Sequence, residues 1–467
     1  MEIQFIGAAQ TVTGSMHKIT VGSKTILLDC GLFQGKRSLS YERNKNFPFD
    51  PVKIDAVILS HAHIDHAGNL PNLVRQGFNA NIFATPATVD LCEIMLKDSA
   101  HINLRDIQFV NKKLLKKHLP KIDPLYEIED VENTIKLFYP KNYNHEFEVV
   151  DGITAMFFDA GHILGSASVL LTIQEPGKSK KIKLGFSGDL GRPKLPILRD
   201  PEFIGNVDYF ICESTYGNKI HTKVDDMEKE LLFVINKTIN RNGKIIIPAF
   251  SVGRTQEVIY ALNNLFNKNL LPKFDVFIDS PLAVNATNIH RNHEECFDKE
   301  TLNILKKDDD IFNFPSLHFI QNVEDSKKLN DRTEPCIIIS ASGMCEGGRI
   351  LHHLANNIGN KNNTVLIVGY QAEHTLGRKL VERFLEIPIF GEIYKRDCEI
   401  VVLNSFSAHA DKNELEEYCS KFDTKKVKQI FLVHGELLQS VPFSEKLKLM
   451  GFSSVQTPKR LDTFNTN

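Results

Sequence analysis

The order of apolar and polar residues predicts a chain that opens as a β-sheet. Short apolar runs broken by glycine-rich turns predict strands at 3–6, 15–21, 25–29 and 56–60. The first helical spacing appears at 86–97, behind Thr85, a residue suited to cap a helix. A second strand-rich region extends from Thr154 to Cys212. The first half of the chain is therefore expected to be rich in sheet.

The pattern changes near residue 215. Helical spacing at 225–242 and 254–266 alternates with apolar runs at 244–247, 276–278 and 336–340. Strands that alternate with helices of this length indicate parallel βαβ units, and hence a separate α/β domain. Short strands return after Glu392, at 400–403 and 429–433. Two domains also fit a chain of 467 residues, since single cores stop growing near ~250–300 residues.

Charge gives no global sign of a nucleic-acid partner. The 56 Lys and Arg residues nearly balance the 58 Asp and Glu residues, so any binding of a polyanion must be local. The strongest basic cluster lies at 111–121 and contains five lysines. We interpret it as the solvated face of a helix, because runs of lysine usually are.

Composition also indicates where the protein resides. The chain begins without a basic segment followed by an apolar one, and no apolar run approaches ~18–20 residues. We expect a cytoplasmic protein with no membrane partner. The eight cysteines are scattered without a CxxC pair, which fits reduced, mostly buried thiols better than disulfides.

The segment 61–66, His-Ala-His-Ile-Asp-His, contains four potential metal ligands within six residues. It follows the apolar run 56–60, so four potential ligands meet at the end of one strand. Alternation places His61 and His63 on one side of an extended loop, while Asp65 and His66 reach a second position nearby. This spacing suits two adjacent metal ions, and imidazole with carboxylate suits zinc.

Two metal ions need more ligands than one motif supplies. Three further polar residues stand beside glycine at the ends of apolar runs, namely His162, Asp189 and His434. Glycine lets the backbone turn closely at such points. Asp29, at the end of another apolar run, is the natural carboxylate to orient a histidine ligand.

With these motifs the chain resembles the metallo-β-lactamase superfamily and, within it, the β-CASP nucleases. Further agreement lies in Glu-Ser-Thr-Tyr-Gly at 213–217 and Ser-Phe-Ser-Ala-His-Ala-Asp at 405–411. The chain is similar to bacterial β-CASP ribonucleases that process RNA, and to the endonuclease subunit that cleaves the 3′ ends of eukaryotic pre-messenger RNA. The resemblance covers essentially the whole sequence.

The resemblance implies an α/β protein, a metallo-β-lactamase αββα sandwich with an inserted α/β β-CASP domain. Residues 1–212 form the first part of the metallo-β-lactamase domain in this interpretation. Residues 213–395 form the inserted domain, and residues 396–467 complete the first domain.

The resemblance also implies two zinc ions per chain. One is held by His61, His63, His162 and Asp189, and the other by Asp65, His66, Asp189 and His434. Asp189 then bridges the two ions. In this family a histidine at the position of His434 accompanies RNA substrates, so we expect single-stranded RNA as the substrate. Products with a 5′-phosphate and a 3′-hydroxyl are likewise implied.

Hydrolysis of a phosphodiester needs a nucleophile, charge stabilisation and a proton for the leaving group. A hydroxide that bridges two zinc ions supplies the first, because metal binding lowers the pKa of water to ~7. His409 is the candidate acid, and Glu213 would hold its other ring nitrogen. We count Asp65 with these two as a catalytic residue.

Two loops of the inserted domain have the chemistry to contact substrate phosphates. The first is the strand-to-helix turn that contains Arg254, whose guanidinium and neighbouring amides could bind an anion. The second contains Ser340, Ser342 and Gly343. His374, which stands where the family pattern has a small residue, is left without an assigned role.

Several alternatives remain open. They are a DNA nuclease of the same family, a non-catalytic RNA-binding subunit of a processing complex, and a small-molecule hydrolase of the superfamily. The inserted domain and the Glu213 and His409 pair oppose the small-molecule hydrolase, and the complete ligand set opposes the non-catalytic subunit.

We expect endonucleolytic cleavage, with exonucleolytic trimming as a further mode. The oligomeric state, including a homodimer, is left open.

Overall fold

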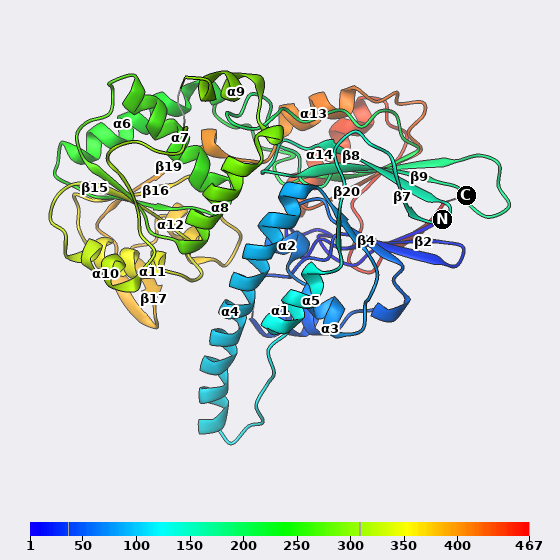
Figure 1. Cartoon of the computed structure of the whole chain (residues 1–467), viewed down its shortest axis with the longest axis horizontal. Coiled ribbons are helices and arrows are strands. Elements are labelled where there is room, and N and C mark those ends of the chain that lie inside the picture. Colours follow the sequence, from blue (N-terminus) through cyan, green and yellow to red (C-terminus); the bar gives the residue numbers. More distant parts are fainter. Residues whose placement is uncertain (36, 308–309, 467) are drawn as a thin grey trace. The chain divides into compact units, whose positions relative to one another are not determined.

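The computed structural model describes residues 1–35, 37–307 and 310–466. The chain folds into two compact units, drawn with its elements in Figure 1. Unit 1 comprises Met1–Pro193, Asp200–Ile220 and His409–Asn467. Unit 2 comprises Lys194–Arg199 and His221–Ala408.

Unit 1 contains two seven-stranded sheets. In spatial order the first sheet consists of β22 (Thr463–Asn465), β1 (Glu2–Phe5), β2 (His17–Val21), β3 (Lys24–Leu28), β4 (Ala56–Ile58), β5 (Ile82–Ala84) and β6 (Phe138–Pro140). The second consists of β21 (Val455–Gln456), β20 (Gln429–Val433), β11 (Tyr209–Glu213), β10 (Ile182–Phe186), β9 (Ala167–Ile173), β8 (Ile153–Asp159) and β7 (Phe147–Val150).

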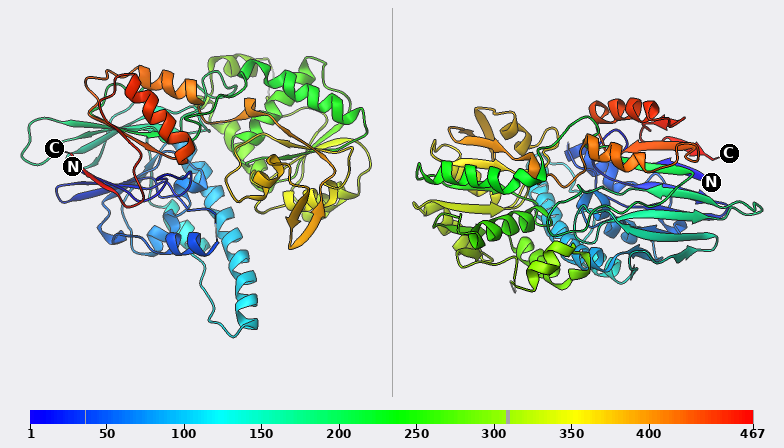
Figure 2. Two further views of the ribbon diagram at one scale, coloured as in Figure 1. Left: turned by 180° about the vertical axis from the view of Figure 1, so that it is seen from behind. Right: turned by 90° about the horizontal axis from the view of Figure 1, so that it is seen from above.

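The two sheets pack face to face over one apolar core. Alternate residues of the strands point inward, so that Ile3 and Phe5 of β1 join Phe157 and Val169 of the second sheet in one buried cluster. The opposite face of the second sheet buries apolar residues of α13 (Lys412–Ser420) and α14 (Leu437–Leu449). Figure 2 shows these helices, in orange and red, against that sheet.

The remaining helices of unit 1 follow strands of the first sheet. They are α1 (Arg37–Lys45), α2 (Ile64–Ala67), α3 (Leu70–Arg75), α4 (Pro86–Lys116) and α5 (Ile128–Ile135). Helices on the outer faces of two facing sheets make the αββα sandwich that the family resemblance implies. The expected fold class is confirmed.

Unit 2 is built on one parallel six-stranded sheet. Its spatial order is β14 (Leu317–Phe319), β13 (Asp275–Ile278), β15 (Cys336–Ser340), β12 (Ile245–Pro248), β16 (Thr364–Ile367) and β19 (Glu399–Val402), with a separate hairpin of β17 (Glu386–Ile389) and β18 (Glu392–Lys395). Its helices are α6 (Met227–Ile239), α7 (Arg254–Asn267), α8 (Pro281–Asn292), α9 (Lys299–Leu305), α10 (Val323–Asp331), α11 (Ile350–Asn357) and α12 (Leu376–Val381). Parallel strands joined through helices are the α/β pattern expected from sequence.

The limits of the compact units differ from the domain limits expected from sequence. Strand β19 pairs in parallel with β16 of the unit 2 sheet, so unit 2 ends at Ala408 rather than at residue 395. Strand β11 pairs with β10 and β20, so Glu213 at its end belongs to unit 1. The expected range 396–467 also ends on Asn467, which lies outside the described residues.

Helix α4 is much longer than the segment 86–97 that the apolar spacing predicts. It begins after Thr85, whose side chain accepts a hydrogen bond from the Thr88 amide, and it continues to Lys116. Its buried residues end at Ala100, which is why the apolar spacing fades beyond that point. Among the described residues, no helix is both long and apolar enough to span a membrane.

Candidate metal centre

Parallel pairing brings three of the expected site residues to one edge of the second sheet. Strands β10, β11 and β20 are neighbours and run parallel, so their carboxyl ends meet. Asp189 follows β10, Glu213 ends β11, and His434 follows β20. The register places Glu213 directly opposite Val433, the residue before His434.

The histidine motif is placed in the same way by the first sheet. Strands β3 and β4 are parallel, with Leu28 opposite Ile58. The chain beyond β4 therefore passes next to Asp29, which accepts hydrogen bonds from the Ser60 amide and hydroxyl. His61 and His63 then precede α2, which carries Asp65 and His66.

The structure brings the first expected ligand set together. One donor atom each from His61, His63, His162 and Asp189 lies within 4.8 Å of the others. The His61 Nε2 and His63 Nδ1 atoms are 3.1 Å apart, and His162 Nε2 is 3.3 Å from His63 Nδ1. Asp189 Oδ2 lies 3.6 Å from both His61 Nε2 and His162 Nε2.

The second set lies beside the first and shares Asp189 with it. One donor atom each from Asp65, His66 and His434 likewise lies within 4.8 Å of the others. His434 Nε2 is 3.3 Å from His66 Nε2 and 3.4 Å from Asp65 Oδ2. Asp189 Oδ2 is 3.3 Å from His66 Nε2, while its Oδ1 is 3.5 Å from His434 Nδ1. Asp189 therefore contacts both clusters.

Side chains outside the two clusters orient the imidazole rings. Asp29 contacts His66 at Nδ1 over 2.7 Å. Ser60 lies 3.0 Å from His61 Nδ1, and Thr215 lies 3.0 Å from His434 Nδ1. The sequence interpretation did not single out Ser60 or Thr215, although both stand at strand ends inside or beside the motifs. A hydroxyl at a strand end is only a weak signal, because serine and threonine are common there.

Burial and charge set the protonation of these clusters. Burial lowers the pKa of His61 well below its ordinary value and that of His63 to about 4. Burial alone would raise the pKa of Asp189, but His434 and His66 outweigh it and hold that pKa well below the usual range. Burial alone would lower the pKa of His66, but Asp189 and Asp29 outweigh it and raise that pKa well above its ordinary value. Neutral His61 and His63 thus lie beside an ionised Asp189, and neutral imidazole with ionised carboxylate is the state that binds a metal ion.

The donor distances fit zinc. Nitrogen ligands ~2.0–2.1 Å from a tetrahedral zinc ion are roughly 3.3–3.4 Å from each other, and the spacings in the first cluster are 3.1 to 3.6 Å. Moreover, the buried Oδ1 atom of Asp189 has no hydrogen-bond donor. Such an atom is costly unless a cation compensates it. The residues present therefore fit the metal centre that the family implies.

His409 and Glu213 form a pair at the border of the clusters. The Nδ1 atom of His409 is 3.2 Å from Glu213 Oε1, and His409 retains 14% side-chain exposure whereas Glu213 is fully buried. Burial lowers the pKa of His409, but Glu213 and Asp189 outweigh it and raise that pKa above its ordinary value. A protonated, partly exposed imidazole next to the clusters can deliver a proton.

The backbone around Gly191 sets the position of His409. Gly191 forms an isolated bridge with His409 and donates its amide to the carbonyl of Ala160 over 2.7 Å. A methyl group at Gly191 would overlap the carbonyl oxygen of Gly161. Glycine thus allows the loops that carry Asp189, His162 and His409 to lie in contact.

The expected phosphate-contacting residues all lie in unit 2, and their roles stay predictions. Arg254 is buried and forms an ion pair with Glu257 and a hydrogen bond with the carbonyl of Phe406. Ser340 donates to the backbone carbonyl of Asp279 over 2.9 Å. The Ser342 hydroxyl accepts from the Glu346 amide over 3.1 Å, which closes the loop that also holds Gly343.

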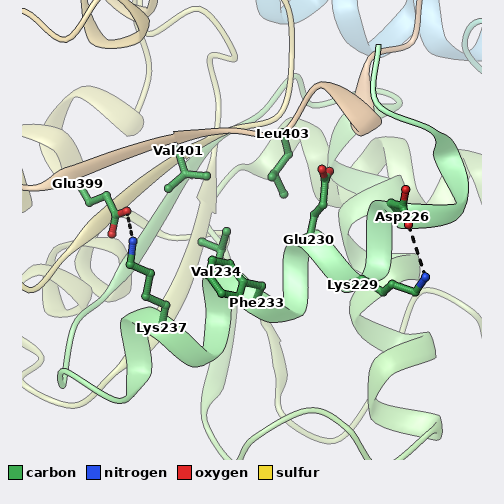
Figure 3. A pocket seen from close by; sticks show the side chains of 9 residues that line it. All are labelled: Asp226, Lys229, Glu230, Phe233, Val234, Lys237, Glu399, Val401 and Leu403. Atoms are coloured by element: carbon green, nitrogen blue, oxygen red, sulfur yellow. Dashed lines mark hydrogen bonds and ion pairs between the residues drawn. The ribbon is translucent and has the colours of Figure 1, made fainter.

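Unit 2 also contains a surface groove of about 500 Å³ between α6 and β19 (Figure 3). Its walls combine apolar and charged side chains, and its lining is Asp226, Lys229, Glu230, Phe233, Val234, Lys237, Glu399, Val401 and Leu403. None of the expected site residues lines this groove. It therefore has no part in the site described above.

Comparison with known families agrees with this geometry. The family model described as the Metallo-beta-lactamase superfamily matches residues 15–132, and the Beta-Casp domain matches residues 255–380. The Zn-dependent metallo-hydrolase RNA specificity domain matches residues 393–458. "Ribonuclease TTHA0252" of Thermus thermophilus is 34% identical over 97% of each chain. The chain belongs to the β-CASP family of the metallo-β-lactamase superfamily.

Other relatives of this β-CASP protein carry different names. An "RNase J-like protein" of Methanocaldococcus jannaschii is 31% identical over 95% of this chain and 94% of its own length. "Transcription termination factor FttA" of Methanococcus maripaludis is 30% identical over 98% of this chain and 71% of its own length. A crystal structure of a protein of unknown function from Enterococcus faecalis V583 shares the fold over 99% of each chain, with a TM-score of 0.54 and 13% identity.

Substituting Gly191 by alanine tests the close approach of the loops. Gly191→Ala should lower the midpoint of the thermal transition of unit 1 by at least ~4 °C, because a backbone overlap cannot be relieved by a rotamer change. Gly359→Ala is the matched control, since an added methyl there meets only a carbonyl oxygen at 3.7 Å. Equal midpoints for both variants, measured by calorimetry, would show that the loops tolerate separation.

Proposed function

We propose that this β-CASP protein is a zinc-dependent ribonuclease that hydrolyses phosphodiester bonds of single-stranded RNA. Endonucleolytic cleavage is the main mode, with 5′-phosphate and 3′-hydroxyl ends as products and the cytoplasm as the location. The observation that carries the proposal is the double cluster around Asp189 with the His409 and Glu213 pair beside it. A small-molecule binding site would not need a separate proton donor of this kind.

The ligand sets proposed from sequence suit the two clusters. His61, His63 and His162 would hold one zinc ion, Asp65, His66 and His434 the other, and Asp189 both. When bound, the two ions supply an activated water at neutral pH and neutralise charge on the phosphoryl oxygens. Asp29, Ser60 and Thr215 hold the imidazole rings in the required orientation from their outer nitrogens.

His409 donates the proton that the leaving oxygen needs. Its Nδ1 faces the Glu213 carboxylate at 3.2 Å, so Nε2 is the nitrogen left to address the substrate. Glu213 is itself fixed, because it accepts hydrogen bonds from the amides of Leu190 over 2.6 Å and Thr215 over 3.3 Å. A carboxylate held in this way keeps the imidazole charged and aimed.

Support for RNA as the substrate comes from two observations. Relatives that match nearly the whole chain are named as a ribonuclease and as an RNase J-like protein. The chain also carries His434, within 3.4 Å of Asp65, at the position where histidine accompanies RNA substrates in the family.

Contacts to phosphates away from the zinc ions are proposed for Ser340, Ser342, Gly343 and Arg254. The Ser342 loop is closed by hydrogen bonds from the amides of Glu346 and Gly347 to the Ser342 hydroxyl. Arg254 must exchange its ion pair with Glu257 for a phosphate, so its contribution depends on a rearrangement of that pair. A homodimer is not required for any of these contacts.

Removing the acid or its carboxylate tests the proton transfer. His409→Ala and Glu213→Gln should each slow turnover by ~10²-fold or more with unchanged zinc content, while the double variant should lose little more than either single one. His318→Ala is the control, because His318 pairs with Asp275 over 3.1 Å at an exposed site in unit 2. Multiplicative losses in single-turnover assays would mean that the two residues act independently.

Circular single-stranded RNA tests the substrate and the mode of cleavage. The protein should cut the circle, cut a linear RNA strand faster than the matched DNA strand, and lose both activities to a chelator that zinc reverses. Duplex RNA should resist, because it is wide and stiff whereas a single strand is flexible. Resistance of the circle together with rapid loss of the linear form would indicate a pure exonuclease, and equal rates on RNA and DNA would remove the preference for RNA.

A further inference from the structure

The outer part of helix α4 extends beyond the rest of unit 1. From His101 to Pro124, a segment we call the arm, no residue is buried. Figures 1 and 2 both show the end of α4 and the returning chain standing away from the other helices of the unit. The Asn111 side chain joins the end of α4 to the returning chain through hydrogen bonds of 2.9 Å to the amide and carbonyl of Ile122. The arm is therefore an ordered element rather than a loose loop.

The charge of the arm opposes that of the rest of the chain. The arm contains six Lys and Arg residues and two aspartates, whereas the whole chain has a formal net charge of −2. The arm thus carries +4 and the remaining residues −6. Five lysines lie between positions 112 and 121, where no acidic residue occurs. This is the cluster that the sequence interpretation assigned to a solvated helix face.

Several lysines on other helices pair with carboxylates one turn away. Lys97 lies 2.7 Å from Glu93, Lys327 lies 2.9 Å from Glu324, and Lys328 lies 2.8 Å from Asp325. Within the described part of the chain, the lysines of the arm form no such pair. Positions 112, 113, 116 and 117 instead place like charges three and four residues apart, which destabilises a helix. A bound polyanion would remove that repulsion.

An aromatic ring accompanies these lysines. Phe109 is 53% exposed, and the Lys113 ammonium lies 4.4 Å from the centre of its ring. Lysines beside an exposed aromatic ring are the combination that binds single-stranded nucleic acid, in which phosphates meet cations and bases stack on rings. An acidic protein partner would contact the lysines, but its binding would not require the exposed ring of Phe109.

Helix α4 connects the arm to the metal centre. The hydroxyls of Thr85 and Thr88, at its first turn, donate to the carbonyl of Gly165 over 2.6 and 2.8 Å, three residues after His162. At 1.5 Å per residue, Lys112 lies ~36 Å along the helix from Thr88. A stacked strand that advances ~3.4 Å per nucleotide covers this length with roughly ten nucleotides.

We propose that the arm is a second RNA-binding site, which holds single-stranded substrate about ten nucleotides from the cleavage site through its lysines and Phe109. This inference rests on the proposed ribonuclease function. Its consequence is a dependence on substrate length. RNA of about 20 nucleotides or more reaches the arm and the centre together, whereas a hexamer reaches only the centre.

The test compares two triple variants, each of which removes three positive charges by replacing lysine with glutamine. The arm variant combines Lys112→Gln, Lys113→Gln and Lys116→Gln, and the control variant combines Lys180→Gln, Lys181→Gln and Lys183→Gln, exposed lysines of the second sheet's β9 to β10 turn and strand β10. The arm variant should raise the KM for a 30-nucleotide RNA about tenfold with unchanged kcat, and leave hexamer cleavage unchanged. The control variant should change neither.

Equilibrium binding separates this inference from the catalytic proposal. The same substitutions in the His409→Ala protein are titrated with a fluorescent 30-nucleotide RNA, so that turnover is not needed. The arm variant should bind about tenfold more weakly, with a salt dependence shallower by about 2 in logarithmic slope. Phe109→Ala should weaken binding about fivefold or more, while Phe233→Ala, an exposed control in unit 2, should not.

Two results would overturn the inference. One is equal RNA affinity of the arm and control variants, whether or not the unsubstituted protein cleaves RNA. The other is a dimer, seen by sedimentation, that Leu104→Gln with Leu115→Gln dissociates while RNA affinity stays the same, because the exposed leucines would then mark a contact between copies of the chain. Absence of RNA cleavage with an intact arm effect would contradict the proposed function alone.

Discussion

The buried carboxylate of Asp189 is the constraint on which the rest of the site depends. It is 2% exposed and lies within 3.6 Å of nitrogen atoms from His61, His66, His162 and His434. An ionised carboxylate in such a place is stable only if positive charge compensates it. The neighbouring imidazoles cannot all be protonated, because burial and their mutual repulsion lower the pKa of His61 and His63. A bound metal ion would supply that positive charge without requiring the buried imidazoles to be protonated.

Strand direction explains how residues far apart in sequence meet at this carboxylate. Three parallel strands of one sheet end at Asp189, Glu213 and His434, and two parallel strands of the other end at Asp29 and the histidine motif. The sandwich core holds both sheets through interlocking apolar side chains. The polar residues therefore sit on rigid strand ends, while the turns between them, such as that of Gly191, supply the close approach.

Sequence reasoning picked out those residues of the two clusters that carry a local signal. The motif at 61–66 and the strand-end positions of His162, Asp189 and His434 were visible as polar residues next to apolar runs and glycine. The hydroxyls of Ser60 and Thr215 were not, because serine and threonine are common at strand ends and only the fold shows that they face His61 and His434. The buried ion pair of Arg254 with Glu257 was likewise invisible, since both residues look like exposed helix positions.

The fold likewise has features that a local sequence signal predicts and features that it does not predict. The strand-rich regions and the βαβ pattern followed from the apolar periods, and the two-sheet sandwich followed from the family resemblance. The pairing of β19 with β16 is a long-range choice that short apolar strands do not specify. The length of α4 beyond Ala100 was missed because the arm buries nothing and so leaves no apolar period to detect.

Anomalous diffraction at the zinc absorption edge, from crystals of the active, zinc-loaded protein, tests the central claim most directly. The account predicts two zinc peaks per chain, one in contact with His61, His63 and His162 and the other with Asp65, His66 and His434, with Asp189 touching both. An active protein with no peak in these clusters, or with a single peak that leaves Asp65, His66 and His434 without metal, would contradict it.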